Sequence, residues 1–338
     1  MPKPVTPSQS LRATIESGRR YAEQTGASRT RSLLEKAHAD LWRRLEKLPN
    51  RWLIEAATTG EEAFTLAQTR ATIAQVEAVL KDLKTGMKTE LVDMGNATAE
   101  LRVGSLLKYL NQREKKFKGI SSRLPIDEAE LLDRAVRGTE SSILNRIASD
   151  PKHRGHKGVL DRYGDAVIGK FEEQLQIGLL TRKPWAEMRA DLTEQSPFLK
   201  GAPAHWAERI VRTELMGASN MAGLEVVRGA QDELGDMVKI LVATFDDRTG
   251  ADSYAVHGQI RRPSEAFDSW YGSYQHPPNR PNDREIVIPH RMSWPIESEF
   301  APLSDSQVSS RWAAEGRKGL PPRRPKMSTV DRKLFGKG

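Results

Sequence analysis

Four side chains in the last third of the sequence have the types that metal hydrolases use. These candidate ligands are His257, His276, Asp283 and His290. Histidine sites for metals commonly place two ligands within a few residues of each other, and this set lacks such spacing. The spacing therefore favours histidines that serve the fold. We expect no metal and no other cofactor.

Composition excludes several further kinds of chemistry. The chain of 338 residues contains no cysteine, which excludes disulfides, thiolate metal ligands and thiol nucleophiles. No apolar run approaches the roughly 18 residues that cross a membrane, so no membrane partner is expected. The first seven residues lack the apolar core of a secretory signal. We expect a cytoplasmically made protein of about two domains.

Nearly all of the net charge of +8 lies at the C-terminus. Residues 316–338 contain one acid, Asp331, and the basic residues Arg317, Lys318, Arg323, Arg324, Lys326, Arg332, Lys333 and Lys337. Proline and glycine are frequent and apolar residues few, which predicts a flexible tail. This tail is either a solvated charge run or a contact to DNA, because clustered bases release counterions from phosphates. Phe335 is its one aromatic residue, which argues against base stacking.

Proline placement separates a helical part from a C-terminal part. No proline occurs between Pro49 and Pro125, whereas prolines crowd residues 263–325, and proline interrupts helices. In the proline-free part an apolar residue recurs every seven positions, at Leu66, Ile73, Leu80, Met87, Met94 and Leu101. This heptad stripe predicts a long helix or a helical hairpin, with the stripe buried in a partner or in a helical bundle. Gly86 and Gly95 are possible breaks.

Shorter helices are expected around this run. Apolar periodicity predicts helices over residues 30–47 and 163–180. Asp127 is a candidate N-cap for a helix that begins after Pro125, with Glu130 as its capping-box partner. Pro184 favours the start of another short helix.

The last third of the sequence alternates helix, strand and turn. Apolar periodicity over residues 203–234 predicts a helix that contains Arg212, Thr213 and Glu214, with Arg212 and Glu208 as a surface pair. The apolar run 237–245 predicts a buried strand. It leads into a turn that side-chain to backbone bonds should organise, formed by Asp246, Asp247, Arg248 and Thr249. Gly258 follows, and a second strand near 284–288 precedes His290, Arg291 and Met292.

This order of elements resembles the phage head morphogenesis family, the Mu-F-like minor head proteins of tailed phages. The matching residues are Arg212, Thr213, Glu214, Asp246, Asp247, Arg248, Thr249, Gly258 and Arg291. The resemblance covers roughly residues 203–295. The family closes its pattern with Cys-Arg-Cys, which corresponds here to His290, Arg291 and Met292, so only the arginine is kept.

The resemblance implies an assembly protein without catalytic residues. It implies a minor capsid protein of the virion that binds the phage portal protein near the portal vertex and is assembled in the host cytoplasm. Such a protein acts in head assembly, DNA retention or DNA ejection. Major capsid or scaffold protein and packaged DNA are further implied partners, the DNA through the basic tail.

Two other functions stay open. Arg212 with Glu297-Ser298-Glu299 is similar to the Arg and Glu-x-Glu elements of ADP-ribosyltransferases. The Ser-Thr-Ser element of those enzymes is missing, because Ser328-Thr329 comes after the glutamates. The other possibility is a DNA-binding protein that acts through its tail alone.

The predicted fold class is α+β. A mainly helical N-terminal region with long helices is expected over residues 1–200, where it would dock a partner. A small α+β domain should follow over residues 201–300, and a flexible basic tail over residues 301–338.

Overall fold

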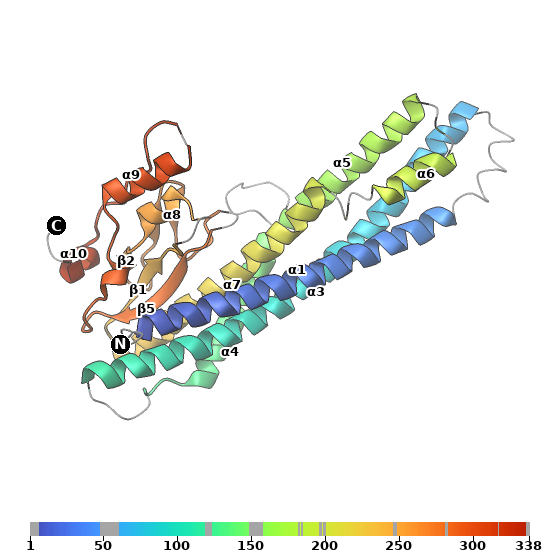
Figure 1. The fold of residues 1–338 in the computed structure, drawn as a ribbon. Helices are drawn as coiled ribbons and strands as arrows, with labels where there is room; N and C mark the ends of the chain where they lie inside the picture. The colour runs from blue at the N-terminus through green and yellow to red at the C-terminus, as the bar shows by residue number, and fades with distance from the viewer. Residues whose placement is uncertain are drawn as a thin grey trace, which may run out of the picture. The chain divides into compact units, whose positions relative to one another are not determined.

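The computed structural model describes residues 7–47, 61–118, 124–148, 158–181, 183, 185–195, 198, 201–245, 249–280, 283–316 and 318–335 (Figure 1). Long helices fill the N-terminal region, and a few antiparallel strands lie in the C-terminal part. The mainly helical α+β fold is therefore confirmed.

The described helices before the first strand are α1 Pro7–Glu46, α3 Glu61–Lys118, α4 Glu128–Ala148, α5 Val159–Leu180, α6 Trp185–Glu194 and α7 Ala202–Leu234. The strands are β1 Met237–Val242, β2 Ile260–Arg261, β3 Phe267–Ser269, β4 Gly272–Tyr274 and β5 Ile286–Arg291. Short helices accompany them: α8 Ala251–Val256, the 3-10 helix η1 Ser298–Phe300, α9 Asp305–Ala314 and α10 Thr329–Phe335.

Helix α3 is continuous over 58 residues, so neither glycine within the heptad stripe breaks it. Gly95 instead permits close helix packing. A Cβ atom at this position would lie 2.4 Å from Cδ1 of Ile143 on α4. Glycine costs about 1 kcal/mol relative to alanine inside a helix, and here the close approach of α4 requires it.

The heptad stripe is buried only in part. Leu80, Met87 and Met94 are at most 7% exposed, whereas Leu101 is 59% exposed. The reason is helical geometry: a straight helix has 3.6 residues per turn, so a seven-residue repeat drifts by about 20° per heptad around it. The side chain of Leu66 lies outside the described residues.

Local signals placed the starts of α4 and α6 correctly, but not that of α1. The Asp127 carboxylate accepts hydrogen bonds from the backbone N–H groups of Ala129 and Glu130, at 2.9 and 3.1 Å, so it is the N-cap of α4. Helix α6 begins directly after Pro184. The helix predicted over 30–47 is the second half of α1, which starts much earlier.

The chain divides into two compact units, each made of several segments. The first, here the sheet unit, comprises residues 1–22, 93–143 and 213–338, and the second, the helical unit, comprises residues 23–92 and 144–212. This division differs from the boundaries predicted at residues 200 and 300. The physical reason is that α1, α3, α4 and α7 each contribute residues to both units.

The helical unit contains no described strand and has a core of aliphatic and aromatic side chains. Leu41, Leu45, Leu80 and Phe171 are at most 2% exposed. Polar contacts between its helices surround this core. They are Arg29–Glu90 at 2.9 Å, Arg44–Asp82 at 3.1 Å and Lys84–Asp161 at 3.0 Å.

The sheet unit is built around three antiparallel strands in the order β2-β1-β5. All six residues of β1 and of β5 are buried, and the two strands pair along their whole length, from Met237 opposite Arg291 to Val242 opposite Ile286. A separate hairpin joins β3 and β4.

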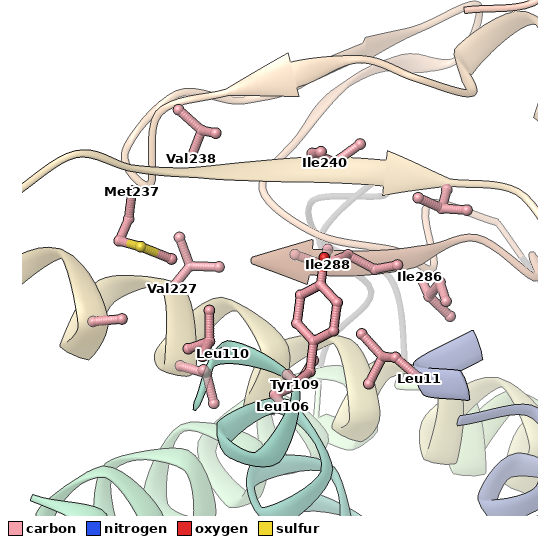
Figure 2. Packing of buried hydrophobic residues seen from close by; sticks show 14 of the residues in the cluster. Leu11, Leu106, Tyr109, Leu110, Val227, Met237, Val238, Ile240, Ile286 and Ile288 are labelled. Carbon is pink, nitrogen blue, oxygen red and sulfur yellow. The ribbon is translucent and has the colours of Figure 1, made fainter. Parts of the chain in front are cut away.

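Helices from the N-terminal half complete the core of the sheet unit. Leu106, Tyr109 and Leu110 of α3 pack under the sheet together with Val227 of α7, and Leu11 of α1 lies beside them (Figure 2). The predicted α+β domain over 201–300 thus buries its sheet on helices from outside that range.

Candidate functional site

Thr249 closes the loop that carries the Asp-Asp-Arg-Thr pattern. Its side chain is buried, and its hydroxyl donates a hydrogen bond to the carbonyl of Thr244. The Thr244 hydroxyl donates in turn to the carbonyl of Arg284 at 2.9 Å. Thr249 thus makes a side-chain to backbone bond of the predicted kind. Asp246, Asp247 and Arg248 lie outside the described residues.

Gly258 occupies a position that only glycine fits. Its φ of +79° lies in the left-handed region. A Cβ atom would also lie 2.6 Å from the backbone nitrogen of Pro302 and 2.7 Å from the carbonyl oxygen of Phe300. The glycine therefore permits close contact between the end of α8 and the segment after η1.

Arg291 is the centre of a buried ionic network. It is the last residue of β5 rather than part of the following loop, and its guanidinium pairs with Glu114 of α3 and with Asp236 before β1. It also donates to the carbonyl of Leu234 at the end of α7, at 3.3 Å. These partners raise the pKa of Arg291 against the opposing effect of burial. One side chain thus joins β1, β5, α3 and α7.

The Arg-Thr-Glu triplet lies on α7 as predicted. Arg212 is exposed and Glu214 is 4% exposed, so the two side chains have opposite environments. The predicted surface pair of Arg212 with Glu208 is wrong among the described residues, because Glu208 pairs with Arg31 of α1 at 3.8 Å. The hypothesis that Arg212 bonds the Asp246–Asp247 turn lies outside the described residues.

The Glu-x-Glu segment is engaged within the sheet unit. Glu297 pairs with Arg113 of α3, whose guanidinium is fully buried and lies 4.6 Å from the ring centroid of Phe117. Burial raises the pKa of Glu297. The backbone carbonyl of Glu299 lies 3.1 Å from Nε2 of His257. In the sheet unit these residues hold η1 in place.

The histidines serve the fold where their partners are described. Nδ1 of His257 accepts the N–H of Ala243 at 3.1 Å, so Nε2 carries the proton and donates to the Glu299 carbonyl. His290 is fully buried, and burial lowers its pKa to about 4. Across the ranges described, no group of three or more acidic or histidine side chains is placed so that it could hold a metal ion.

Asp283 belongs to a buried carboxylate cluster that sequence reasoning missed. Arg280 donates to Asp283 and to Asp252, both at 2.6 Å. Glu285 lines one small hollow together with these three residues, and burial raises its pKa to about 7, with the charge of Asp283 contributing. Neither spacing nor periodicity links these residues, since the cluster joins α8 to the loop before β5.

The C-terminal segment is attached to the sheet unit, which corrects the prediction of a flexible tail for residues 318–335. Asp331 on α10 accepts the N–H of Ile260 at 2.7 Å and pairs with the buried Arg261 at 2.8 Å. The hydroxyl of Ser328 donates to the carbonyl of Ile260 at 3.2 Å. The physical reason is that the single acid of the tail compensates an arginine on the edge strand β2.

The basic side chains of this segment point to solvent. Lys318, Arg323, Lys326, Arg332 and Lys333 are exposed, and Arg324 is partly exposed. Arg317 and Lys337 lie outside the described residues. Because α10 holds the segment, the charges of Lys318, Arg323, Arg324 and Lys326 form a basic strip on the sheet unit, defined here as residues 318–326.

A groove with a volume of about 490 Å³ lies between the start of α1 and the middle of α3 in the sheet unit. Its lining residues are Ser10, Leu11, Thr14, Glu100, Leu101, Gly104, Ser105, Lys108, Tyr109 and Gln112. The exposed end of the heptad stripe, Leu101, therefore lies in a groove. Nothing in the described structure lies within 4 Å of a Cβ atom built on Gly104.

Comparison with known protein families, curated proteins and solved structures finds no match. None of the helices in the described ranges has the length and apolar character to cross a membrane.

Proposed function

We propose that this chain is a phage minor head protein that binds the portal and acts in head assembly, DNA retention or DNA ejection. The observation that carries the proposal is the structural use of the resembling residues. Thr249 closes a loop, Gly258 permits a close backbone contact, and Arg291 joins four elements. A pattern whose residues build a small α+β fold is what an assembly protein without its own chemistry requires.

The helices supply the surface for the portal in this proposal. Leu80 and Met87 are buried among the helices of their own unit, so these two positions serve folding and not docking. Leu101 is 59% exposed and lies in the groove between α1 and α3. The space around Gly104 next to this exposed leucine suits contact with a portal helix. Major capsid or scaffold protein are further proposed partners.

The basic strip supports the proposed contact with packaged DNA. Its exposed lysines and arginines are held on a folded unit, where they can neutralise phosphates without first being ordered. In this proposal the protein is in the virion near the portal vertex, after assembly in the host cytoplasm.

Quantitative mass spectrometry of nuclease-treated, gradient-purified particles tests the proposal. We expect a reproducible ratio of this chain to portal subunits near or below one. Absence from particles, with the protein abundant in the lysate, would overturn the virion assignment.

Co-purification with the portal protein of the same phage tests the docking surface. Leu101→Glu should weaken retention by the portal about 10-fold or more, because a charge in a docked apolar position is desolvated. Ile177→Glu is the matched control, since Ile177 on α5 is 52% exposed. Equal retention of both variants would remove the groove from the proposal.

A further inference from the structure

The tip of the β3–β4 hairpin presents two aromatic rings to solvent. Ser269 pairs with Gly272, so Trp270 and Tyr271 are the two central residues of the turn. Two-residue hairpin turns favour asparagine, aspartate and glycine at these positions, not large aromatic residues. Trp270 is 64% exposed and Tyr271 is 47% exposed. Turn formation and core packing therefore do not account for these side chains.

The turn is held in one conformation by hydrogen bonds. The Ser269 hydroxyl donates to the carbonyl of Gly272 at 2.8 Å and accepts the N–H of Tyr271 at 3.1 Å. The side-chain amide of Asn279 also donates to Ser269, at 2.7 Å. The two rings are thus attached to a turn that is already ordered, so less conformational entropy is lost when a ligand stacks on them.

One ring is oriented by the carboxylate cluster. The hydroxyl of Tyr271 donates to Asp252 at 3.4 Å, and the guanidinium of Arg280 lies 5.1 Å from the ring centroid. Arg280 is itself fixed by Asp252 and Asp283. One arginine is thus set against two carboxylates below Tyr271, so a further cation is needed before this edge can accept a phosphate.

The basic strip passes the same aromatic rings. Trp270, Tyr271 and Arg280 line a narrow hollow of about 10 Å³ together with Pro322 and Arg323. The strip thus brings a cation to the hairpin tip, although the two segments are about fifty residues apart in the sequence. The nearby carboxylate of Asp268 is paired with Arg261 at 3.3 Å. Sequence reasoning argued against base stacking because the tail has a single aromatic residue, and the fold supplies two others.

We propose that the hairpin tip and the basic strip bind an unpaired strand of DNA. Bases would stack on Trp270 and Tyr271, while Arg323 and its basic neighbours neutralise the phosphates. Duplex DNA keeps its base faces stacked inside the helix, so exposed rings at a turn favour a strand with free bases. The inference goes beyond the proposed function, whose DNA contact is with packaged DNA, because it names a strand with unpaired bases as the ligand.

Fluorescence anisotropy with the full-length chain tests this inference. The probes are a short labelled oligothymidine and a labelled duplex of the same length. Trp270→Ala should weaken binding of the single strand about 10-fold, as for the loss of one stacked base, and change duplex binding less than about twofold. The control is Tyr21→Ala, because Tyr21 on α1 is also 64% exposed. Circular dichroism should show unchanged folding of both variants.

Replacing Arg323 by alanine tests the proposed contact of the basic strip with the phosphates. It should weaken single-strand binding and lower the slope of log affinity against log salt by about 0.7. An equal loss for Trp270→Ala on duplex and single strand, or no loss on either, would overturn the inference. Tighter binding of oligouridine than of oligothymidine would overturn the assignment to DNA.

The two proposals can fail separately. If Trp270→Ala binds single strands normally while the chain is still found in particles at a fixed ratio to portal, only the stacking surface is wrong. If the chain binds single strands through Trp270 but is absent from particles, the head-protein function is wrong and the stacking surface stands.

Discussion

Replacement of Arg291 by methionine should loosen the central sheet strongly. Methionine keeps much of the volume but removes the charge that compensates Glu114, which is 2% exposed, and Asp236. Breaking a buried ion pair by removing one partner costs about 3–5 kcal/mol. The Arg291→Met, Glu114→Gln double variant should recover part of this loss, because it no longer buries a carboxylate without its arginine.

Hydrogen exchange with mass spectrometry localises the effect. Peptides that cover β5 should exchange roughly 100- to 5,000-fold faster in Arg291→Met, since about 1.4 kcal/mol corresponds to a factor of ten. Arg332→Met is the control, because Arg332 on α10 is exposed and should change exchange little. A β5 exchange rate within threefold of the unmodified chain would refute the argument that this network holds the sheet. So would a double variant that is less stable than the sum of its single changes.

Three further predictions concern stability. Gly258→Ala should lower it by about 2 kcal/mol or more in a thermal melt, while Gly250→Ala should be tolerated, because Gly250 has a φ of −76° and no neighbour closer than 3.8 Å. Burial lowers the pKa of His290 from 6.5 to about 4, so the unfolded chain binds more protons in that range and stability falls as pH drops from 6.5 to 4. In urea unfolding over this pH range, the His290→Leu variant should lose about 3 kcal/mol less stability than the unmodified chain. A variant with the same pH profile as the unmodified chain would contradict the prediction. Leu80→Glu should unfold the helical unit by circular dichroism, whereas Leu101→Glu should leave the helix content unchanged.

Sequence patterns predicted the elements whose causes are local. The apolar periodicity over 203–234 gives α7 within one residue, and Asp127 caps α4 through bonds to residues two and three positions ahead. The apolar run 237–245, which follows α7, predicted β1, although the strand ends at Val242 rather than Phe245. Caps and periodicities depend on neighbours in the chain, so a sequence contains them directly.

Features that depend on distant residues were not predictable in this way. The charge run from Lys318 onward resembles a solvated tail until Asp331 is seen to pair with Arg261, seventy residues earlier. The sheet needs Leu106 and Leu110 from α3, which no pattern in 201–300 indicates. The proposed DNA-binding surface at Trp270 was missed for the same reason, because its basic partner Arg323 comes from another segment.

The interleaving of the two units has a consequence for synthesis on the ribosome. Residues 7–22 of α1 belong to the sheet unit, yet β5 and α10 emerge last. At about 5–20 residues per second, the first helix waits roughly 15–60 seconds before the strands that it helps to bury are translated. During that time its apolar side chains are exposed on the nascent chain. We expect production of this protein to depend on chaperones that hold nascent chains, and a shortened chain that lacks β5 to aggregate.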